Sequence, residues 1–391
     1  MDLLLRQLTW HNGNEELSGD IRISSGVIVE TGKDLLRRRG EHAIELPDHF
    51  IYPGLINAHD HLEMNLYPRL GSPPYQNYVQ WANDIFKTAQ HSYRAIEEVD
   101  IEDRLLWGGI KNLLAGVTTV VHHNPWHRIL SEKKFPVQVV KISWAHSLEF
   151  EKKIRNCFPK KGNTPFVVHA AEGTDALAYT EISALDTLGL IQRNTTLVHA
   201  IAMSQADMNN IAQQQASIVW CPASNIFMFG KTADIPALKT NVRVALGSDS
   251  TMTGSPTLLH EIQFASKLKL VHAGEIYEMV TGTPARIFGL PGNGIRATSA
   301  ADLSITPIKN KNYFENLAMT KPADITAVIR QGDVRLSDDK YFNKLPLKYT
   351  IYIEGAPKKI SIDVAALKRK IERKVGTAIL NEGELWRMIG V

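Results

Sequence analysis

The chain has 391 residues, of which 44% are hydrophobic and 22% are charged, and its 44 Lys and Arg against 41 Asp and Glu leave a formal charge of +3. This composition excludes disordered and collagen-like classes, and the balanced charge gives no reason to expect nucleic-acid binding. The two cysteines, Cys157 and Cys221, are too few for a disulfide framework or a four-thiolate zinc site.

The hydropathy of the chain indicates its cellular location. The first six residues lack the long apolar run of a signal peptide, and no window of about 18 apolar residues could cross a membrane. We therefore expect a cytoplasmic protein without a membrane partner. The oligomeric state stays open, and a homo-oligomer is one of the alternatives.

The predicted elements change in character along the chain. Residues 1–50 carry short apolar runs separated by turn residues, which predicts β-strands. From residue 51, apolar runs alternate with longer helical stretches, the pattern of βα units around a parallel sheet. These runs are 51–57, 117–121, 137–143, 166–169, 196–199, 217–221 and 243–246. Strand-like runs return after residue 290, and 362–375 is the core of a mostly helical tail.

The simplest domain organisation places one α/β barrel inside a small β domain built from both ends. The β domain takes residues 1–50 and 291–360, the barrel takes 51–290, and the helical tail takes 361–391. Only about 40 residues separate His123 from Phe166, whereas two βα units need about 60. We therefore expect one barrel strand to be short, displaced or missing.

Side chains that can bind a metal follow several predicted strands. His59 and His61 are spaced i, i+2, so both imidazoles point to the same side of a strand. His169 and His199 end two further strands, and Asp249 follows another. Each of them alone could be a hydrogen-bonded strand-end histidine or a helix N-cap. The recurrence of the pattern favours a catalytic face at the carboxyl ends of barrel strands.

Further motifs accompany these residues in order along nearly the whole chain. They are 53–61, 116–121, 169–172, His199, 221–225, 246–250, 283–290 and 301–303. This ordered set resembles the amidohydrolase superfamily, and more closely its branch of cytosine, guanine, adenosine and S-adenosylhomocysteine deaminases. The resemblance implies a (β/α)8-type barrel, with the reservation about one strand, and a β-sandwich formed by both termini.

The resemblance also implies the roles of individual residues. One divalent ion, Zn²⁺ in first place and Fe²⁺ as the alternative, would be held by His59, His61, His169 and Asp249. Such an ion makes hydroxide available near neutral pH. Glu172 would be the general acid/base, and Asp249 would also orient or deprotonate the water. His199 would donate to the substrate or the water, or bind a second ion. For Glu172 the structural alternative is a carboxylate at a helix start.

Five further residues are candidate substrate contacts: Arg69, His123, Trp144, His146 and Asn225. Three of them follow predicted strands, Asn225 belongs to the 221–225 motif, and Arg69 belongs to the segment 63–81, which could form an aromatic lid. Each could equally pack or hydrogen-bond within a loop. Lys141 lies several residues before a strand end, so we do not expect it to bridge two metal ions.

These features predict a mononuclear metal-dependent hydrolase that deaminates a nitrogen heterocycle, with a small molecule as its substrate. One alternative is the same site cleaving a cyclic amide, or removing a ring substituent as triazine hydrolases do. A proton donor such as Glu172 favours deamination, because ammonia is a poor leaving group. A non-catalytic binding module is disfavoured, because all four ligands and Glu172 are present.

Overall fold

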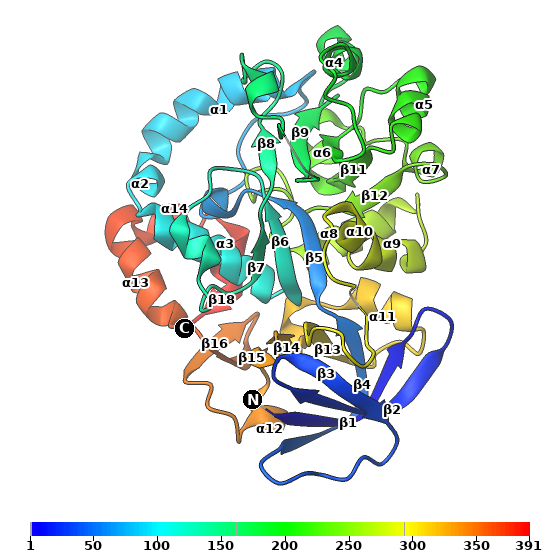
Figure 1. Cartoon of the computed structure of the whole chain (residues 1–391). Helices are drawn as coiled ribbons and strands as arrows, with labels where there is room; N and C mark the ends of the chain where they lie inside the picture. The colour runs from blue at the N-terminus through cyan, green and yellow to red at the C-terminus, as the bar shows by residue number, and fades with distance from the viewer. Residues whose placement is uncertain (1, 161–162, 293) are drawn as a thin grey trace.

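The computed structural model describes residues 2–160, 163–292 and 294–391. Two kinds of sheet make up the chain: a mostly antiparallel sheet formed by both ends, and parallel strands surrounded by helices (Figure 1). The predicted α/β class is therefore confirmed. Within these described ranges, no helix combines the length and the apolar character needed to span a bilayer.

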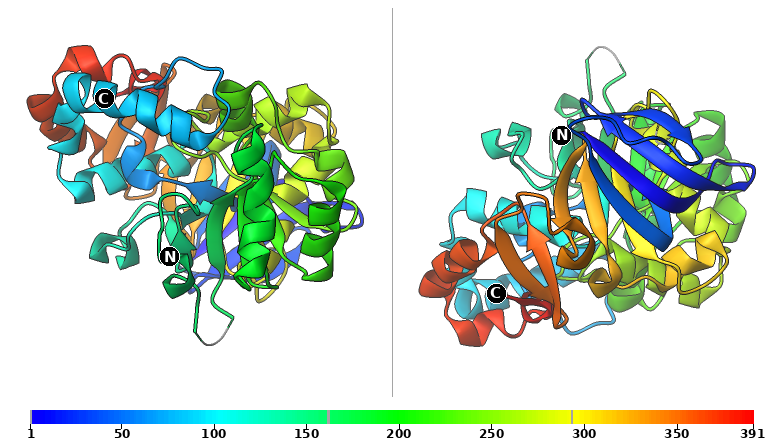
Figure 2. Two further views of the ribbon diagram at one scale, coloured as in Figure 1. Left: turned by 90° about the horizontal axis from the view of Figure 1, so that it is seen from above. Right: turned by 90° about the horizontal axis from the view of Figure 1, so that it is seen from below.

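The terminal sheet has ten strands in the order β18-β16-β17-β15-β14-β13-β4-β1-β2-β3. Their bounds are β1 (Leu3–His11), β2 (Glu16–Ser24), β3 (Val27–Gly32), β4 (His42–Pro53), β13 (Leu303–Pro307), β14 (Ala327–Arg330), β15 (Asp333–Ser337), β16 (Tyr349–Ile353), β17 (Ala356–Ile360) and β18 (Ile389–Gly390). Antiparallel pairing of β4 with β13 joins the two ends of the chain. In the view from below, the blue N-terminal strands lie beside the yellow and orange C-terminal ones (Figure 2).

The parallel strands form two further sheets that the helices cover. One sheet contains β5 (Leu55–Asp60), β6 (Val117–His122) and β7 (Gln138–Val140). The other contains β8 (Ser143–Ala145), β9 (Phe166–Ala170), β10 (Thr195–His199), β11 (Ser217–Trp220) and β12 (Arg243–Leu246). Nearly all their residues are buried, which explains why they read as continuous apolar runs. The ends of β12 and β5 lie together, because the Asp249 amide donates to the His59 carbonyl at 3.1 Å.

The run 137–143, predicted as one strand, is two short strands in the structure. Strand β7 pairs with β6, and β8 pairs with β9, with Lys141 and Ile142 between them. One extended stretch therefore passes from the first parallel sheet to the second without a crossover helix. This accounts for the shortage of residues before Phe166. Lys141 is exposed, and its Nζ atom lies 5.1 Å from the centre of the Trp126 ring.

The run 51–57, also predicted as one strand, is divided at Gly54. Its first part ends β4 in the terminal sheet, and its second part begins β5. A Cβ atom at Gly54 would lie 2.2 Å from Oγ1 of Thr118, so only glycine allows this close approach to β6. Hydrophobicity carries no sign of the break, because both parts are buried.

Most of the helices alternate with the strands along the chain, and three more lie near its C-terminus. Their bounds are α1 (Tyr78–Ser92), α2 (Arg94–Glu97), α3 (Ile101–Leu113), α4 (Ala176–Thr187), α5 (Gln205–Gln213), α6 (Pro222–Phe229), α7 (Ile235–Leu238), α8 (Leu258–Leu268), α9 (Ala273–Met279), α10 (Gly282–Ile287), α11 (Tyr313–Met319), α12 (Asp339–Phe342), α13 (Val364–Val375), α14 (Thr377–Leu380) and α15 (Glu384–Met388). Short 3-10 helices are η1 (Leu62–Met64), η2 (Arg128–Ser131), η3 (Ile154–Asn156) and η4 (Pro322–Asp324).

The predicted helical tail packs on α2 and α3, the helices that precede β6 in the sequence. Figure 1 shows α13, in red, beside α2 and α3. Lys370 of α13 forms an ion pair with Asp103 of α3 at 2.6 Å, and the rings of Trp386 and Trp107 lie 4.8 Å apart. The tail ends in β18, which adds an edge strand to the terminal sheet beside β16.

Candidate metal centre

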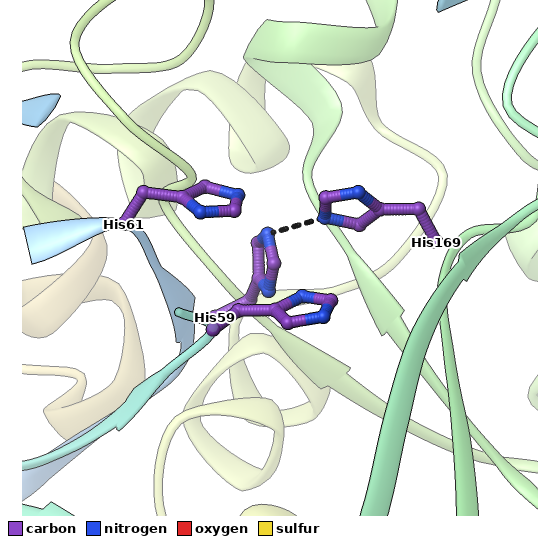
Figure 3. A group of neighbouring side chains, drawn as sticks. His59, His61 and His169 are labelled. Carbon is purple, nitrogen blue, oxygen red and sulfur yellow. Dashed lines mark hydrogen bonds between the residues drawn. The ribbon is translucent and has the colours of Figure 1, made fainter. Parts of the chain in front are cut away.

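Three histidine side chains converge where β5 and β9 end (Figure 3). His59 and His61 lie two residues apart at the end of β5, so both rings extend to the same side. His169 belongs to β9, and its Nε2 atom is 3.2 Å from Nε2 of His59. All three are buried. Strand geometry therefore brings three imidazoles to one enclosed point.

Asp249 reaches the same point from the end of β12. Its Oδ1 atom is 3.7 Å from Nε2 of His59 and 3.6 Å from Nε2 of His61. Its Oδ2 atom accepts hydrogen bonds from the hydroxyls of Ser224 and Thr253 at 2.8 and 2.9 Å. Burial alone would raise the pKa of Asp249, but His61 and His199, together with hydrogen bonds from the Ser224 hydroxyl and the Ser250 amide, hold this pKa below its usual value. The carboxylate is therefore ionised beside the imidazoles.

This set of donor atoms fits a divalent cation. Burial lowers the pKa of His59 and of His169 well below the usual range, so both rings are neutral. The Nδ1 atoms of His59, His61 and His169 are buried and have no hydrogen-bond partner among the described residues. Two ring nitrogens only 3.2 Å apart share either a proton or a cation. Neutral imidazoles with a carboxylate are the ligands that zinc and iron prefer.

Glu172 and His199 form a second pair beside His169. Ligand atoms of these three residues lie within 4.8 Å of one another. Nε2 of His199 is 3.5 Å from Oε1 of Glu172, and Nδ1 of His199 is 2.8 Å from Oδ1 of Asn225. Because an amide oxygen only accepts, Nδ1 carries the hydrogen and Nε2 faces Glu172. Asn225 therefore lies behind His199, fully buried.

The carboxyl group of Glu172 is poised to hold a proton. Burial raises the pKa of Glu172 well above its usual range, and the negative charges of Asp249 and Glu181 add to the effect. Glu181 is itself held by hydrogen bonds from the Tyr78 hydroxyl and the Ala171 amide, each at 2.7 Å. A neutral carboxyl in this position can donate a proton near pH 7.

A cavity of about 410 Å³ adjoins these groups. Its polar wall comprises His61, Glu63, Glu97, Arg104, His146, His169, Glu172, His199, Asp249, Ser250 and Thr253. Its apolar wall comprises Met64, Tyr67, Tyr78, Trp81, Ala82, Ile85, Ile101, Phe150, Met228 and Met252. Helix α1 supplies two of the aromatic rings, so the segment 63–81 together with α1 forms part of the wall. The size and the mixed lining suit a small organic molecule.

The five candidate substrate contacts lie in different places. His146 lines the cavity, and burial lowers the pKa of His146 to about 4, so its ring is neutral at pH 7. His123 is fully buried, and the Trp144 ring packs 5.5 Å from it. Asn225 bonds to His199, as described above. Of this group, only His146 is part of the cavity wall.

Arg69 makes its contacts with residues other than the candidate metal ligands. Its Nη2 atom donates to the Gly254 carbonyl at 2.8 Å, and its guanidinium lies 4.9 Å from the centre of the Phe227 ring. It lines a separate pocket of about 200 Å³ that also contains Glu382 and Glu384. This placement gives no support to the expectation that Arg69 contacts the substrate, because the Arg69 side chain already bonds and packs within neighbouring loops.

A buried lysine connects two of the segments that carry the candidate metal ligands. Lys111 of α3 is completely buried, and its Nζ atom donates to Oδ1 of Asn65 and to the backbone carbonyl of Asp249, both at 2.8 Å. Nζ also lies 3.3 Å from the carboxylate of Asp60, which lies between His59 and His61 in sequence. Strand alternation directs Asp60 to the opposite side from the two histidines. The lysine thus ties β5 to the segment that carries Asp249.

Sequence reasoning missed this lysine and the hydroxyl donors to Asp249. Lys111 lies in an amphipathic helix where a lysine normally reaches solvent, and nothing local marks it as buried. Ser224 belongs to α6 and Thr253 to the segment after β12, and only the fold brings them to one carboxylate. For Ser224 a signal existed, because the 221–225 motif contains it.

Comparisons with known proteins identify the family of the chain. The sequence model of the amidohydrolase family matches residues 137–335. A 5-methylthioadenosine/S-adenosylhomocysteine deaminase of Pyrococcus furiosus is 25% identical over 382 residues, covering 81% of this chain and 88% of the relative.

Two solved structures show the same fold. An adenosine deaminase of Xanthomonas campestris with bound zinc has a TM-score of 0.71 and 17% identity, covering 95% of this chain and 97% of the other. Atrazine chlorohydrolase of Arthrobacter aurescens complexed with zinc has a TM-score of 0.74 and 16% identity, covering 95% and 100%. The resemblance predicted from the motifs is thus confirmed at the level of the family.

The buried lysine generates a stability prediction. Replacing Lys111 by Met leaves Asp60 as a buried carboxylate without its cation, which should lower the free energy of unfolding by about 3–5 kcal/mol. The matched control is Lys370→Met, which breaks the half-exposed ion pair with Asp103 and should cost less than about 1 kcal/mol. Urea unfolding measures both; equal losses would contradict the structural role of Lys111.

A buried carboxyl group generates a pH prediction. Glu261 of α8 is completely buried, and its Oε1 atom accepts from the Ala223 amide at 2.8 Å. Burial raises the pKa of Glu261 to about 7. Because the folded pKa exceeds the unfolded one, this group contributes stability below about pH 4.5 that is lost as the pH rises through 7.

Glu261→Gln should therefore become more stable relative to the wild type as the pH rises from 4.5 to 7.5, by about 3 kcal/mol in the unfolding free energy. Chemical denaturation at several pH values measures the difference. Glu315→Gln, the same substitution at an exposed position, serves as the control. A flat profile for Glu261→Gln would show that the carboxyl titrates normally.

Proposed function

The chain belongs to the amidohydrolase family, and from this premise we propose that it is a metal-dependent hydrolase of carbon–nitrogen bonds that releases ammonia from a nitrogen heterocycle. One observation carries the proposal: His59, His61, His169 and Asp249 lie together beside a cavity, and all of them except His59 line its wall together with Glu172. We infer further that the two parallel sheets act as one barrel and that the terminal strands form a β-sandwich.

The residues that would hold the cation are His59, His61, His169 and Asp249, with zinc proposed ahead of iron. When bound, such a cation lowers the pKa of a water ligand to about 7 and so supplies a nucleophile at neutral pH. The hydroxyls of Ser224 and Thr253 fix Oδ2 of Asp249. This leaves Oδ1 to face the histidines and to orient the attacking water.

Proton transfer is assigned to Glu172. Its raised pKa keeps the carboxyl protonated in the cavity, where it can give the proton to a ring nitrogen while water adds to the neighbouring carbon. The attacking water gives up two protons: one goes to the departing amine, which leaves as ammonia, and the other returns to Glu172 as the carbon–oxygen bond becomes a carbonyl. His199, whose Nδ1 is fixed by Asn225, orients Glu172 through Nε2. His146 offers a neutral hydrogen-bonding group to the heterocycle.

The cavity suggests the class of substrate. At about 410 Å³ it is larger than a single ring requires, and its apolar wall carries Met64, Met228 and Met252 with the aromatic rings of Tyr78 and Trp81. Aromatic rings stack on flat heterocycles, and methionines adapt to an apolar substituent. We therefore propose an adenine-type nucleoside with an apolar substituent, in keeping with the name of the Pyrococcus relative.

A second candidate is hydrolysis of a ring substituent other than an amine, or of a cyclic amide. The likeness to a zinc-containing atrazine chlorohydrolase over 95% of this chain favours it. A product screen of purified, metal-loaded protein over purine nucleosides, pyrimidines, pterins and triazines separates the candidates. Ammonia release supports the first proposal, whereas chloride or carboxylic acid release supports the second.

Loss of a proposed ligand should remove both metal and activity. His61→Ala deletes an imidazole, so we expect less than one equivalent of bound metal and no measurable turnover. Elemental analysis of purified protein and an ammonia assay give the two readouts. The exposed His272→Ala is the control and should keep both metal and activity. A fully loaded and active His61→Ala protein would refute the ligand assignment.

Loss of the proposed proton donor should spare the metal. Glu172→Gln keeps the shape of the side chain and removes its titrating proton, so turnover should fall by about 10² to 10⁴ with metal content unchanged. The matched control is Glu261→Gln at neutral pH, which changes a buried carboxyl outside the cavity wall. Normal turnover by Glu172→Gln would remove this residue from the mechanism.

A further inference from the structure

We propose that His123 is an additional ligand of the same cation and binds it through Nδ1; this inference rests on the metal centre of the proposed function. His123 directly follows β6 and is completely buried. One ring nitrogen from each of His59, His61, His123 and His169 lies within 4.8 Å of the others. A residue expected to contact substrate is thus a member of the metal-binding group.

The hydrogen bonds of the His123 ring identify the nitrogen that would bind. Nε2 lies 2.9 Å from the carbonyl oxygen of Ala145. A carbonyl oxygen only accepts, so Nε2 carries the hydrogen and Nδ1 carries a lone pair in the neutral ring. Nδ1 is buried and has no hydrogen-bond partner in the described part of the chain. Buried polar atoms rarely lack a partner, so this atom calls for an explanation.

Metal ligation explains this arrangement better than packing does. Histidine ligands commonly donate their second ring nitrogen to a backbone carbonyl, which fixes the ring and its tautomer. His123 makes this contact with Ala145. The ring also stacks on His61, with centres 5.6 Å apart and planes at 13°. Stacking alone would suit a phenylalanine equally well, and would give no role to the unpartnered Nδ1 atom.

The backbone holds His123 in register with the other ligands. The His123 amide donates to the carbonyl of Asp60 at 3.0 Å. Asp60 lies between His59 and His61 in the sequence. Strand β6 pairs with β5 up to His122 opposite Asp60. The His123 ring therefore keeps its place relative to the two β5 histidines. The expected site has four imidazoles and one carboxylate, one imidazole more than the set implied by the family resemblance.

The test separates the two ring nitrogens of His123. In His123→Gln the amide can still donate to the Ala145 carbonyl, as Nε2 does, but no atom replaces Nδ1. In His123→Asn the side-chain oxygen can occupy the position of Nδ1 and partly replace the lost ligand. His122→Gln is the control, because His122 is also buried but lies outside the group.

Full-length protein of each variant is titrated with Co²⁺, whose visible spectrum reports the ligand number, and with Zn²⁺ against a chelator. We expect His123→Gln to change the Co²⁺ spectrum and to weaken Zn²⁺ binding by more than about 10-fold. His123→Asn should fall between it and the wild type, and His122→Gln should match the wild type. An unchanged spectrum and affinity in His123→Gln would overturn the inference.

Two further outcomes keep this test decisive. If His123→Gln fails to fold, zinc X-ray absorption of the wild-type protein counts the imidazoles directly: four support the inference and three overturn it. If the wild type binds one ion and releases ammonia while His123→Gln binds the metal normally, only this inference fails. A wild type that binds no metal would overturn the proposed function as well.

Discussion

The structure depends on one electrostatic constraint, the gathering of several imidazoles and a carboxylate at a buried point. Unpartnered polar atoms in such a place cost several kcal/mol unless something binds them. The Nε2 atoms of His59 and His169 lie 3.2 Å apart, and those of His59 and His61 lie 3.7 and 3.6 Å from Oδ1 of Asp249. A divalent cation bound between these atoms would satisfy them, and the proposed chemistry follows from such a site.

The fold meets this constraint by placing each group at the end of a strand. Alternation along β5 separates the two histidines from Asp60, which instead meets Lys111 on the other side. The same lysine holds the backbone of Asp249, so the carboxylate and the β5 histidines share one support. Glu172 follows β9 closely and reaches the cavity from the side of His169. The proposed acid/base group and the proposed metal ligands are therefore neighbours in the fold.

Much of this arrangement could be predicted from sequence because its signals are local. The i, i+2 spacing of His59 and His61 and the apolar runs of the parallel strands needed only strand periodicity. The division at Gly54 was missed because burial on both sides makes the run look continuous. The split of 137–143 depends on which neighbours each half pairs with. The positions of Lys111, Arg69 and His123 depend on contacts between distant segments, and the sequence carries no local sign of these contacts.

The most direct test is a crystal structure grown with one equivalent of zinc, with diffraction measured at the zinc absorption edge. The account predicts one anomalous peak about 2.0–2.1 Å from a ring nitrogen of His59, of His61 and of His169, with Asp249 also in contact. A peak elsewhere, with the histidine cluster free of zinc, would contradict the central claim.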